Sequence, residues 1–405
     1  MTKNPSSESR KSRSRQTFRS DISRRTAEES APRRPRTNHL FFVQFVSSAG
    51  RIRRLDRVII APMSALRIPP PIVPGDVIGV TAPSAGVGAA LRARFDFCAA
   101  QVRARGFIPR MGTCLFSDDV TSASPQSRAA ELMAMLTDDS IHAVMPPWGG
   151  DLLIEILPLL DFDAIARATP KWYIGWSDCT TFMLPLLTLS NRLSLHGMNF
   201  MDAAFKPAPG AAWWRDVVSL SAGDVFTQQS FSRYQKTRRD YGEFPEQTEY
   251  TPDTPTRWRV LGAERDVAVA GRLIGGCADV LSRLIGTPYG DVERFAHEHA
   301  PDGVIVYLEN CEMLSNDAAR CWNQFKLAGW FRHATALIIG RTEARGWDSY
   351  NQHRAIADAF GDLPIPVLYD VDFGHQAPQQ LIVNGAQARV RYNSDGRGEI
   401  AQRLA

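Results

Sequence analysis

Cysteine is scarce and scattered in this chain of 405 residues. The six cysteines include no Cys-x-x-Cys pair, and none has the spacing of a metal-ligand motif. Small secreted scaffolds held by disulfides carry cysteine at a far higher density. The sequence therefore excludes a disulfide scaffold and favours free thiols in a reducing compartment. A basic segment followed by an apolar one, as in a signal peptide, is also missing from the start, so we expect a cytoplasmic protein.

Long apolar runs are missing as well. A membrane-spanning helix needs about 18 to 20 consecutive apolar residues, and the longest runs here, such as Phe182–Leu189, are much shorter. Hydrophobic residues nevertheless make up 44% and charged residues 22% of the chain. This balance is typical of a globular protein with a substantial core, and it excludes fibrous and wholly disordered chains.

Charge of one sign gathers at one end of the chain. Residues 1–62 hold 15 of the 47 Lys and Arg residues but only 5 of the 43 Asp and Glu residues, so the rest of the chain is slightly acidic. The first 62 residues are also rich in Ser, Arg and Pro, a composition that favours disorder. We predict that residues 1–62 form a disordered basic extension, with Met63 as an alternative start of the chain, and that the folded body binds no nucleic acid.

Short apolar segments typical of strands alternate with helical patterns from Gly75 onward. This alternation predicts an α/β fold with a parallel sheet whose two faces are covered by helices. We expect an N-terminal domain over residues 63–204, a crossover or substrate loop over 205–260, and a C-terminal domain over 261–405. Near the end, Asn384-Gly385 between two apolar segments predicts a β-hairpin over Gln380–Arg391.

A buried strand, Trp172–Gly175, leads into Ser177, and an apolar helix follows at once from Thr180. A serine on such a tight strand-to-helix turn has an exposed hydroxyl, and the following N–H groups can stabilise an oxyanion. The alternative is that Ser177 or Asp178 only caps the helix.

A double glycine, Gly149-Gly150, follows another strand and could likewise offer N–H donors to an anion. Tight-turn geometry alone would also explain it. We further expect Asp151 to cap a helix that continues to Leu160.

A serine nucleophile needs a base and an acid that orients the base. Among the histidines, His196 and His375 lie in loop or strand-end contexts that suit a base. For the acid, Glu309 ends an apolar strand and therefore points to the same edge of a sheet, while Glu312 is a competitor. Each of these residues could instead have a purely structural role.

Taken together, these segments resemble the LD-carboxypeptidase family of serine peptidases, which includes the microcin C immunity (MccF-type) enzymes. The likeness spans about residues 70–395. It is carried by Gly75–Ser84, Trp148–Asp161, Ile174–Asp178, Gly271–Gly276, Leu284–Thr287, Leu308-Glu309 and Gly374-His375.

The resemblance implies two α/β domains: a Rossmann-like parallel sheet with a nucleophile elbow, and a swivelling β/α-type C-terminal domain that carries the acid and the base. It assigns Ser177 as nucleophile, Glu309 as acid and His375 as base. The N–H of Asp178 and the turn at Gly149 and Gly150 match the oxyanion hole.

The implied function is a serine carboxypeptidase or amidase that cleaves a murein-type LD-peptide or a peptidyl- or aminoacyl-nucleotide. The alternative is a catalytically idle relative that only binds such ligands. Trp148 and Trp258 are the candidate substrate-binding residues. Trp258 is either a stacking residue on a nucleotide-like group or a core tryptophan at a domain junction. Pro146-Pro147-Trp148 also replaces the approach to the double glycine that is led by Arg or Ile elsewhere in the family, where an arginine would suit a murein carboxylate. The resemblance implies no cofactor and no metal, and it suggests a homodimer.

Overall fold

The computed structural model describes residues 65–405. The predicted extension over residues 1–62 lies outside the described residues. No helix within residues 65–405 is long and apolar enough to cross a membrane.

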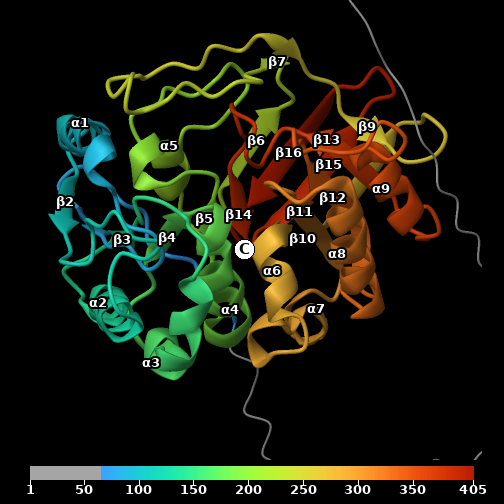
Figure 1. Ribbon diagram of the computed structural model, residues 1–405. Helices are drawn as coiled ribbons and strands as arrows, with labels where there is room; N and C mark the ends of the chain where they lie inside the picture. Colours follow the sequence, from blue (N-terminus) through green and yellow to red (C-terminus); the bar gives the residue numbers. More distant parts are fainter. Residues whose placement is uncertain (1–64) are drawn as a thin grey trace, which may run out of the picture. The chain divides into compact units, whose positions relative to one another are not determined.

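The first part of the described chain alternates strands and helices, as the sequence predicts (Figure 1). Its elements are β1 (Val77–Val80), α1 (Arg92–Ala104), β2 (Ile108–Met111), α2 (Pro125–Thr137), β3 (Ala143–Val144), α3 (Phe162–Arg167), β4 (Trp172–Gly175), α4 (Thr180–Ser190) and β5 (Ser194–His196). The second half is built from β10 (Val267–Cys277), α6 (Ala278–Leu281), α7 (Val292–His299), β11 (Val304–Glu309), α8 (Ser315–Leu327), β12 (Ala334–Gly340), α9 (Gln352–Phe360), β13 (Val367–Val371), β14 (Ile382–Asn384), β15 (Gln387–Tyr392) and β16 (Gly398–Arg403). Short elements connect the two: α5 (Trp214–Val218), β6 (Val225–Gln229), β7 (Arg233–Tyr234), β8 (Thr254–Pro255) and β9 (Arg259–Val260).

Two large sheets organise these elements. The first has the order β14-β5-β4-β3-β1-β2 and is parallel except for its edge strand β14. The second has the order β6-β16-β15-β10-β11-β12-β13-β9, with β10 to β13 parallel and the outer strands antiparallel. The protein is therefore an α/β protein with a largely parallel N-terminal sheet and a mixed C-terminal sheet.

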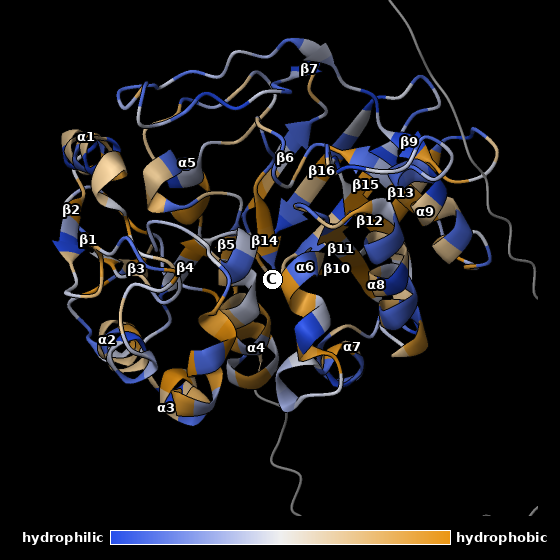
Figure 2. Ribbon diagram, viewed as in Figure 1, coloured by the Kyte–Doolittle hydropathy of each residue, from blue (hydrophilic) through white to orange (hydrophobic). Residues whose placement is uncertain are grey.

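The core explains why the central strands are apolar on both faces. In β4, Trp172 and Ile174 pack into one cluster while Tyr173 packs into another, so both faces of the sheet are covered. In β11, Ile305 and Tyr307 likewise pack into one cluster, while the residues that alternate with them pack into another on the opposite face. Figure 2 shows apolar residues on the strands, whereas α8 and α9 carry both apolar and polar residues.

Helix α4 belongs to the core of both halves. Its apolar side chains share one hydrophobic cluster with Ile274 of β10 and with residues of α6 to α9. The predicted helix after Ser177 is apolar because nearly all of its residues are buried.

Two local predictions were wrong. Asn384-Gly385 does form a turn, but the strands on its two sides enter different sheets: β14 pairs with β5, and β15 pairs with β10 and β16. The predicted hairpin therefore does not form, because each strand finds a longer-range partner. The helix expected after Asp151 is a 3₁₀ segment, Leu153–Leu159, with no side-chain cap and with a proline inside it.

Candidate active site

Ser177 lies on a sharp turn between β4 and α4. It opens a 3₁₀ turn, Ser177–Cys179, and has a φ of 61°, in the left-handed region that non-glycine residues rarely adopt. Such a conformation is disfavoured by about 1 to 3 kcal/mol and persists only where the surroundings impose it. The geometry is that of a nucleophile elbow, as the sequence predicts.

Hydrogen bonds around the buried Asp178 hold this turn in place. Its carboxylate accepts from Ser84 Oγ at 2.6 Å, from the Leu153 N–H at 2.9 Å and from Thr181 Oγ1 at 2.8 Å. Burial raises the pKa of Asp178, although these hydrogen bonds oppose the shift. The side chain of Asp178 therefore fixes the turn and leaves its main-chain N–H beside Ser177 Oγ.

The double glycine lies directly against this turn. A Cβ added to Gly149 would lie 3.0 Å from Ser177 Oγ and 2.9 Å from the Asp178 nitrogen. Gly150 has a φ of 135°, and a Cβ there would lie 2.4 Å from Ser84 Oγ. The structure thus brings the predicted oxyanion-hole residues together, and both positions require glycine for space.

Glu309 and His375 form a hydrogen-bonded pair at the carboxyl ends of the C-terminal strands. Glu309 ends β11 and is fully buried, and its Oε2 lies 2.8 Å from Nδ1 of His375, which follows β13. Gly374, with a φ of 100°, lets the loop approach closely, because a Cβ there would lie 3.0 Å from Glu309 Oε2. The other carboxylate oxygen of Glu309 has no hydrogen-bond partner within residues 65–405.

Each member of this pair stabilises the charged form of the other. Burial disfavours the carboxylate of Glu309, but the charge and hydrogen bond of His375 hold its pKa below the ordinary value. Burial also disfavours the imidazolium of His375, but Glu309, together with the nearby Cys311 thiol, raises the pKa of His375 above its usual 6.5.

Ser177 and His375 follow strands of different sheets, and the contacts between these two segments run through their neighbours. Trp176, next to Ser177, packs its ring on the ring of His375 with centroids 4.4 Å apart. Thr180 Oγ1 donates to the Ser177 carbonyl at 2.7 Å and accepts from the Cys277 N–H of β10 at 3.2 Å. Within the described part of the chain, no hydrogen bond joins Ser177 Oγ to His375.

The two competing candidates take other positions. Glu312 does not contact His375; its main-chain N–H donates to Asp279 at 3.2 Å. His196 is fully buried in β5, near Glu309 and His375, and neither of its ring nitrogens has a hydrogen-bond partner among the described residues. Burial lowers the pKa of His196 to about 4, so it is held as the neutral imidazole.

The two candidate tryptophans differ. Trp148 is half-buried and stacks on Tyr241 with centroids 5.9 Å apart. Trp258 has no exposed surface, packs in the core of the C-terminal sheet, and donates its indole N–H to Asp372 at 2.7 Å. This burial contradicts the predicted stacking role of Trp258, because a side chain inside the core has no face to offer a ligand.

A polar cluster that the sequence did not predict lies beside Trp176 and Gly374, the neighbours of Ser177 and His375. Asp202 accepts from the Trp176 indole at 3.1 Å and from the Tyr241 hydroxyl at 2.7 Å, and it lies 3.4 Å from the Arg238 guanidinium. These residues and Gly374 line one small cavity. No motif marks them, because Arg238 and Tyr241 come from the crossover segment and meet Asp202 only in the folded chain.

The thiol of Cys277 lies close to Glu309 and His375. Ligand atoms of Cys277, Glu309 and His375 are all within 4.8 Å of one another, a donor set that could hold a metal ion. Burial raises the pKa of the Cys277 thiol well above its usual range, so the neutral thiol is favoured there.

Comparison with known proteins identifies the family. Residues 78–197 match the model of the LD-carboxypeptidase N-terminal domain, and residues 270–390 match that of the LD-carboxypeptidase C-terminal domain. The chain therefore belongs to the LD-carboxypeptidase family.

Individual relatives are distant in sequence, but each match covers most of the relative's length. The microcin C7 self-immunity protein MccF of Escherichia coli is 23% identical over 353 residues, which cover 80% of this chain and 93% of that protein. A Bacillus subtilis protein named as a probable murein peptide carboxypeptidase is 21% identical over 321 residues, or 78% of this chain and 88% of that protein.

Solved structures agree in fold. A structure of MccF in complex with aspartyl sulfamoyl adenosine superposes with a TM-score of 0.70 at 20% identity, covering 83% of this chain and 98% of that chain. The muramoyltetrapeptide carboxypeptidase from Oxalobacter formigenes gives 0.60 at 19% identity, covering 80% and 98%.

Proposed function

We propose that this protein is a serine carboxypeptidase or amidase that cleaves an amide bond near the end of a murein-type LD-peptide or of an aminoacyl-nucleotide. The observation that supports it most is the buried Glu309–His375 pair, 2.8 Å apart, whose imidazole packs on Trp176, the neighbour of a serine in a left-handed elbow. A buried carboxylate that orients a histidine beside a strained serine is the arrangement that acyl transfer needs.

In the proposed reaction, His375 acts through Nε2, because its Nδ1 faces Glu309. Nε2 takes the proton of Ser177, whose Oγ attacks the amide carbonyl, and the N–H groups near Gly149 and Asp178 stabilise the oxyanion. His375 then protonates the leaving amine. Water, activated by the same imidazole, hydrolyses the acyl-enzyme and restores Ser177.

The polar cluster beside the triad supports recognition of a substrate carboxylate. Trp148 stands where an arginine would suit such a group, but Arg238 brings a half-exposed guanidinium over the ring of Trp176. Asp202 neutralises part of that charge at 3.4 Å and holds the guanidinium in place. Arg238 is then the residue that binds the terminal carboxylate of an LD-peptide.

The second candidate is an idle relative that binds such ligands without cleaving them. One observation favours it: no hydrogen bond joins Ser177 to His375 within residues 65–405. Hydrogen bonds between catalytic groups are often long in ligand-free enzymes and shorten on substrate binding, so the enzyme stays the better conclusion.

The test is hydrolysis of two substrates by the wild type and by Ser177→Ala. The substrates are a tetrapeptide that ends in L-Lys-D-Ala and an aminoacyl-sulfamoyl adenosine. Release of D-Ala that the variant loses supports a murein-peptide carboxypeptidase, and cleavage of the adenosine conjugate alone supports an MccF-type activity. Ser127→Ala, on the exposed side of α2, is the control that should retain wild-type rates. Binding of a substrate without turnover by any variant would favour the idle relative.

A further inference from the structure

A second cavity lies on the C-terminal sheet, at the opposite end of its strands from the triad. It has a volume of about 570 Å³, within the range of small-molecule sites. Arg272 of β10 lies on its wall, whereas the triad side of the same strand ends at Cys277. At about 3.3 Å per residue, these two positions are separated by about 16 Å. The cavity is therefore separate from the proposed active site.

The cavity exists because helices cover only part of this sheet face. The side of β11 and β12 that packs into the shared cluster is covered by α6 to α9. On β15, Ala388 and Val390 face the other side, into the core of the C-terminal sheet, so Arg389 between them points outward. The helical layer ends at α7, whose last residue, His299, forms part of the cavity wall.

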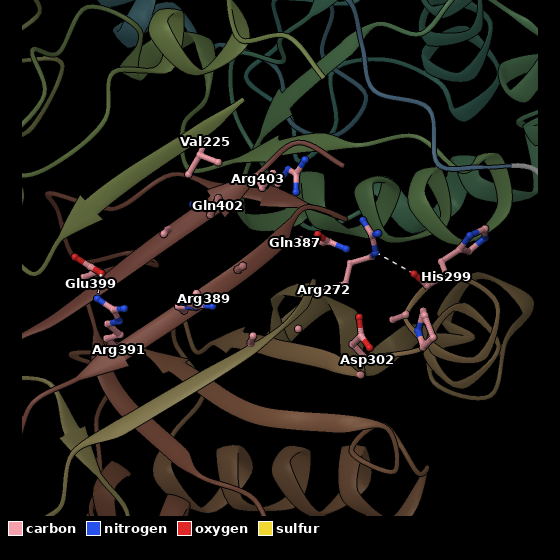
Figure 3. A pocket seen from close by; sticks show the side chains of 17 residues that line it. Val225, Arg272, His299, Asp302, Gln387, Arg389, Arg391, Glu399, Gln402 and Arg403 are labelled. Atoms are coloured by element: carbon pink, nitrogen blue, oxygen red, sulfur yellow. Dashed lines mark hydrogen bonds and ion pairs between the residues drawn. The ribbon is translucent and has the colours of Figure 1, made fainter. Parts of the chain in front are cut away.

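Arginines outnumber carboxylates among the charged residues that line this cavity. Figure 3 shows Arg389 and Arg391 on one strand, Arg403 on the next, and Arg272 near His299. Four arginines face two carboxylates there, those of Asp302 and Glu399. The floor between the arginines is made of small residues, which leaves open space above it: Ala270, Gly271, Gly303 and Ala401.

The charges of these arginines are poorly neutralised by the protein. Arg389 and Arg403 form no ion pair and no side-chain hydrogen bond within residues 65–405, and Arg391 has only Glu399 at 3.4 Å. The guanidinium of Arg272 is fixed instead, donating to main-chain oxygens of His299 at 3.0 Å, Gly385 at 2.6 Å and Ala405 at 2.5 Å.

The sheet places these positive charges close together. Arg403 lies directly opposite Gln387, two residues along β15 from Arg389, so the two arginines are diagonal neighbours on one face. Arg391 follows Arg389 by two residues, about 7 Å along the strand. Like charges that are neighbours on one sheet face repel each other. A bound anion removes this repulsion and gains charge-assisted, bidentate hydrogen bonds from the guanidinium groups.

We infer that this cavity is a binding site for a small polyanion that carries at least two phosphate or carboxylate groups. Two anionic groups a few ångströms apart bridge Arg389 and Arg403, and the fixed Arg272 offers its remaining N–H groups from the β10 side. Four arginines and two carboxylates give the lining a net charge of +2 (4 − 2), so a ligand with two negative charges neutralises the cavity, whereas a singly charged ligand leaves it positive.

The experiment is calorimetric titration of the full chain with inorganic pyrophosphate, and in parallel with citrate. The test variant is Arg389→Gln/Arg403→Gln. The control is Arg397→Gln, which removes one exposed arginine from the β15–β16 turn outside the cavity. We expect saturable binding by the wild type, weakened about tenfold or more by the double variant and less than about twofold by the control.

Comparison of the two probes separates the chemistries: tighter pyrophosphate binding indicates a phosphate ligand, and tighter citrate binding indicates a carboxylate ligand. The proposal is wrong if neither probe binds with a Kd below about 10 mM at low salt. It is also wrong if the control weakens binding as much as the double variant, because the attraction would then be general surface charge. A second variant, Ala401→Glu, places a carboxylate on the cavity floor and should abolish binding while circular dichroism and hydrolysis by the triad stay unchanged.

Discussion

His196 gives the sharpest test of the electrostatics around the triad, and it needs no substrate. The imidazole is fully buried in β5, packs edge-on against Tyr307 with centroids 5.5 Å apart, and has no hydrogen-bond partner on either nitrogen among the described residues. Burial lowers the pKa of His196 to about 4, against 6.5 for an accessible histidine. We predict that protonation of this one side chain destabilises the folded protein as the pH falls.

The sign and size follow from linkage. Below pH 6.5 the unfolded chain binds a proton on His196, whereas the folded protein binds it only near pH 4. The free energy of unfolding therefore falls by up to about 1.4 kcal/mol per pH unit as the pH decreases. Between pH 7 and pH 4.5 this amounts to about 2 kcal/mol. His375 contributes a smaller slope of opposite sign near pH 6.5, because the folded protein already holds a proton there that the unfolded chain takes up only as the pH falls. This contribution is common to the wild type and to a variant at His196. The stability that the lowered pKa of Glu309 provides is lost only below about 4.5.

The assay is urea unfolding of the wild type and of His196→Phe at several pH values across this window. The measured quantity is the difference between the two proteins, in which other titrating groups, such as His299 with its pKa lowered by burial, cancel. From pH 7 to pH 4.5, the free energy of unfolding of the wild type should fall by about 2 kcal/mol more than that of the variant. Parallel curves for the two proteins would refute the reasoning, and His196→Leu checks that the result does not depend on the phenylalanine ring.

Three predictions concern catalysis, measured on whichever substrate the protein cleaves. Glu309→Gln should lower kcat by about 10³- to 10⁴-fold, because an amide no longer fixes the tautomer of His375. The rise of kcat/KM with pH should also move to lower pH. The reason is that the neutral imidazole is the active form and the pKa of His375 falls without the carboxylate. Unchanged pH dependence would contradict the pairing. Gly149→Ala should lower kcat by about 10²-fold or more with KM little changed, since its Cβ would lie 3.0 Å from Ser177 Oγ. Arg238→Gln should raise KM by about tenfold for a peptide with a free terminal carboxylate but not for its amide, and equal effects on both peptides would remove the proposed contact.

The local signals in the sequence predicted the elements that carry the site. The apolar strand before Ser177 and the apolar helix after it were placed correctly, because a buried strand and a buried helix each have a distinctive run of residues. Glu309 was likewise predictable at the end of an apolar strand. Its pairing with His375, 66 positions away, follows from the order of strands in the sheet, which the resemblance supplied and periodicity did not.

Long-range partners explain what the sequence did not predict. The turn at Asn384-Gly385 has the local chemistry of a hairpin, but the pairing of the flanking strands is decided by sheet edges elsewhere in the chain. Trp258 resembles an exposed loop residue because its neighbours are charged, and it is buried because Asp372 provides a hydrogen-bond acceptor in the core. No local sequence pattern predicts that Asp202 and Arg238 are neighbours, because they come together only in the folded chain.

Because of strand β14, the first sheet cannot be completed until nearly the whole chain has been synthesised. It supplies residues 382–384 to the edge of the first sheet, beside β5, which the ribosome releases almost two hundred residues earlier. Until β14 arrives, the edge of β5 offers unpaired main-chain groups to any other nascent chain. Truncation before residue 382 leaves that edge permanently open, so shortened chains should aggregate even though every residue of the nucleophile elbow is present.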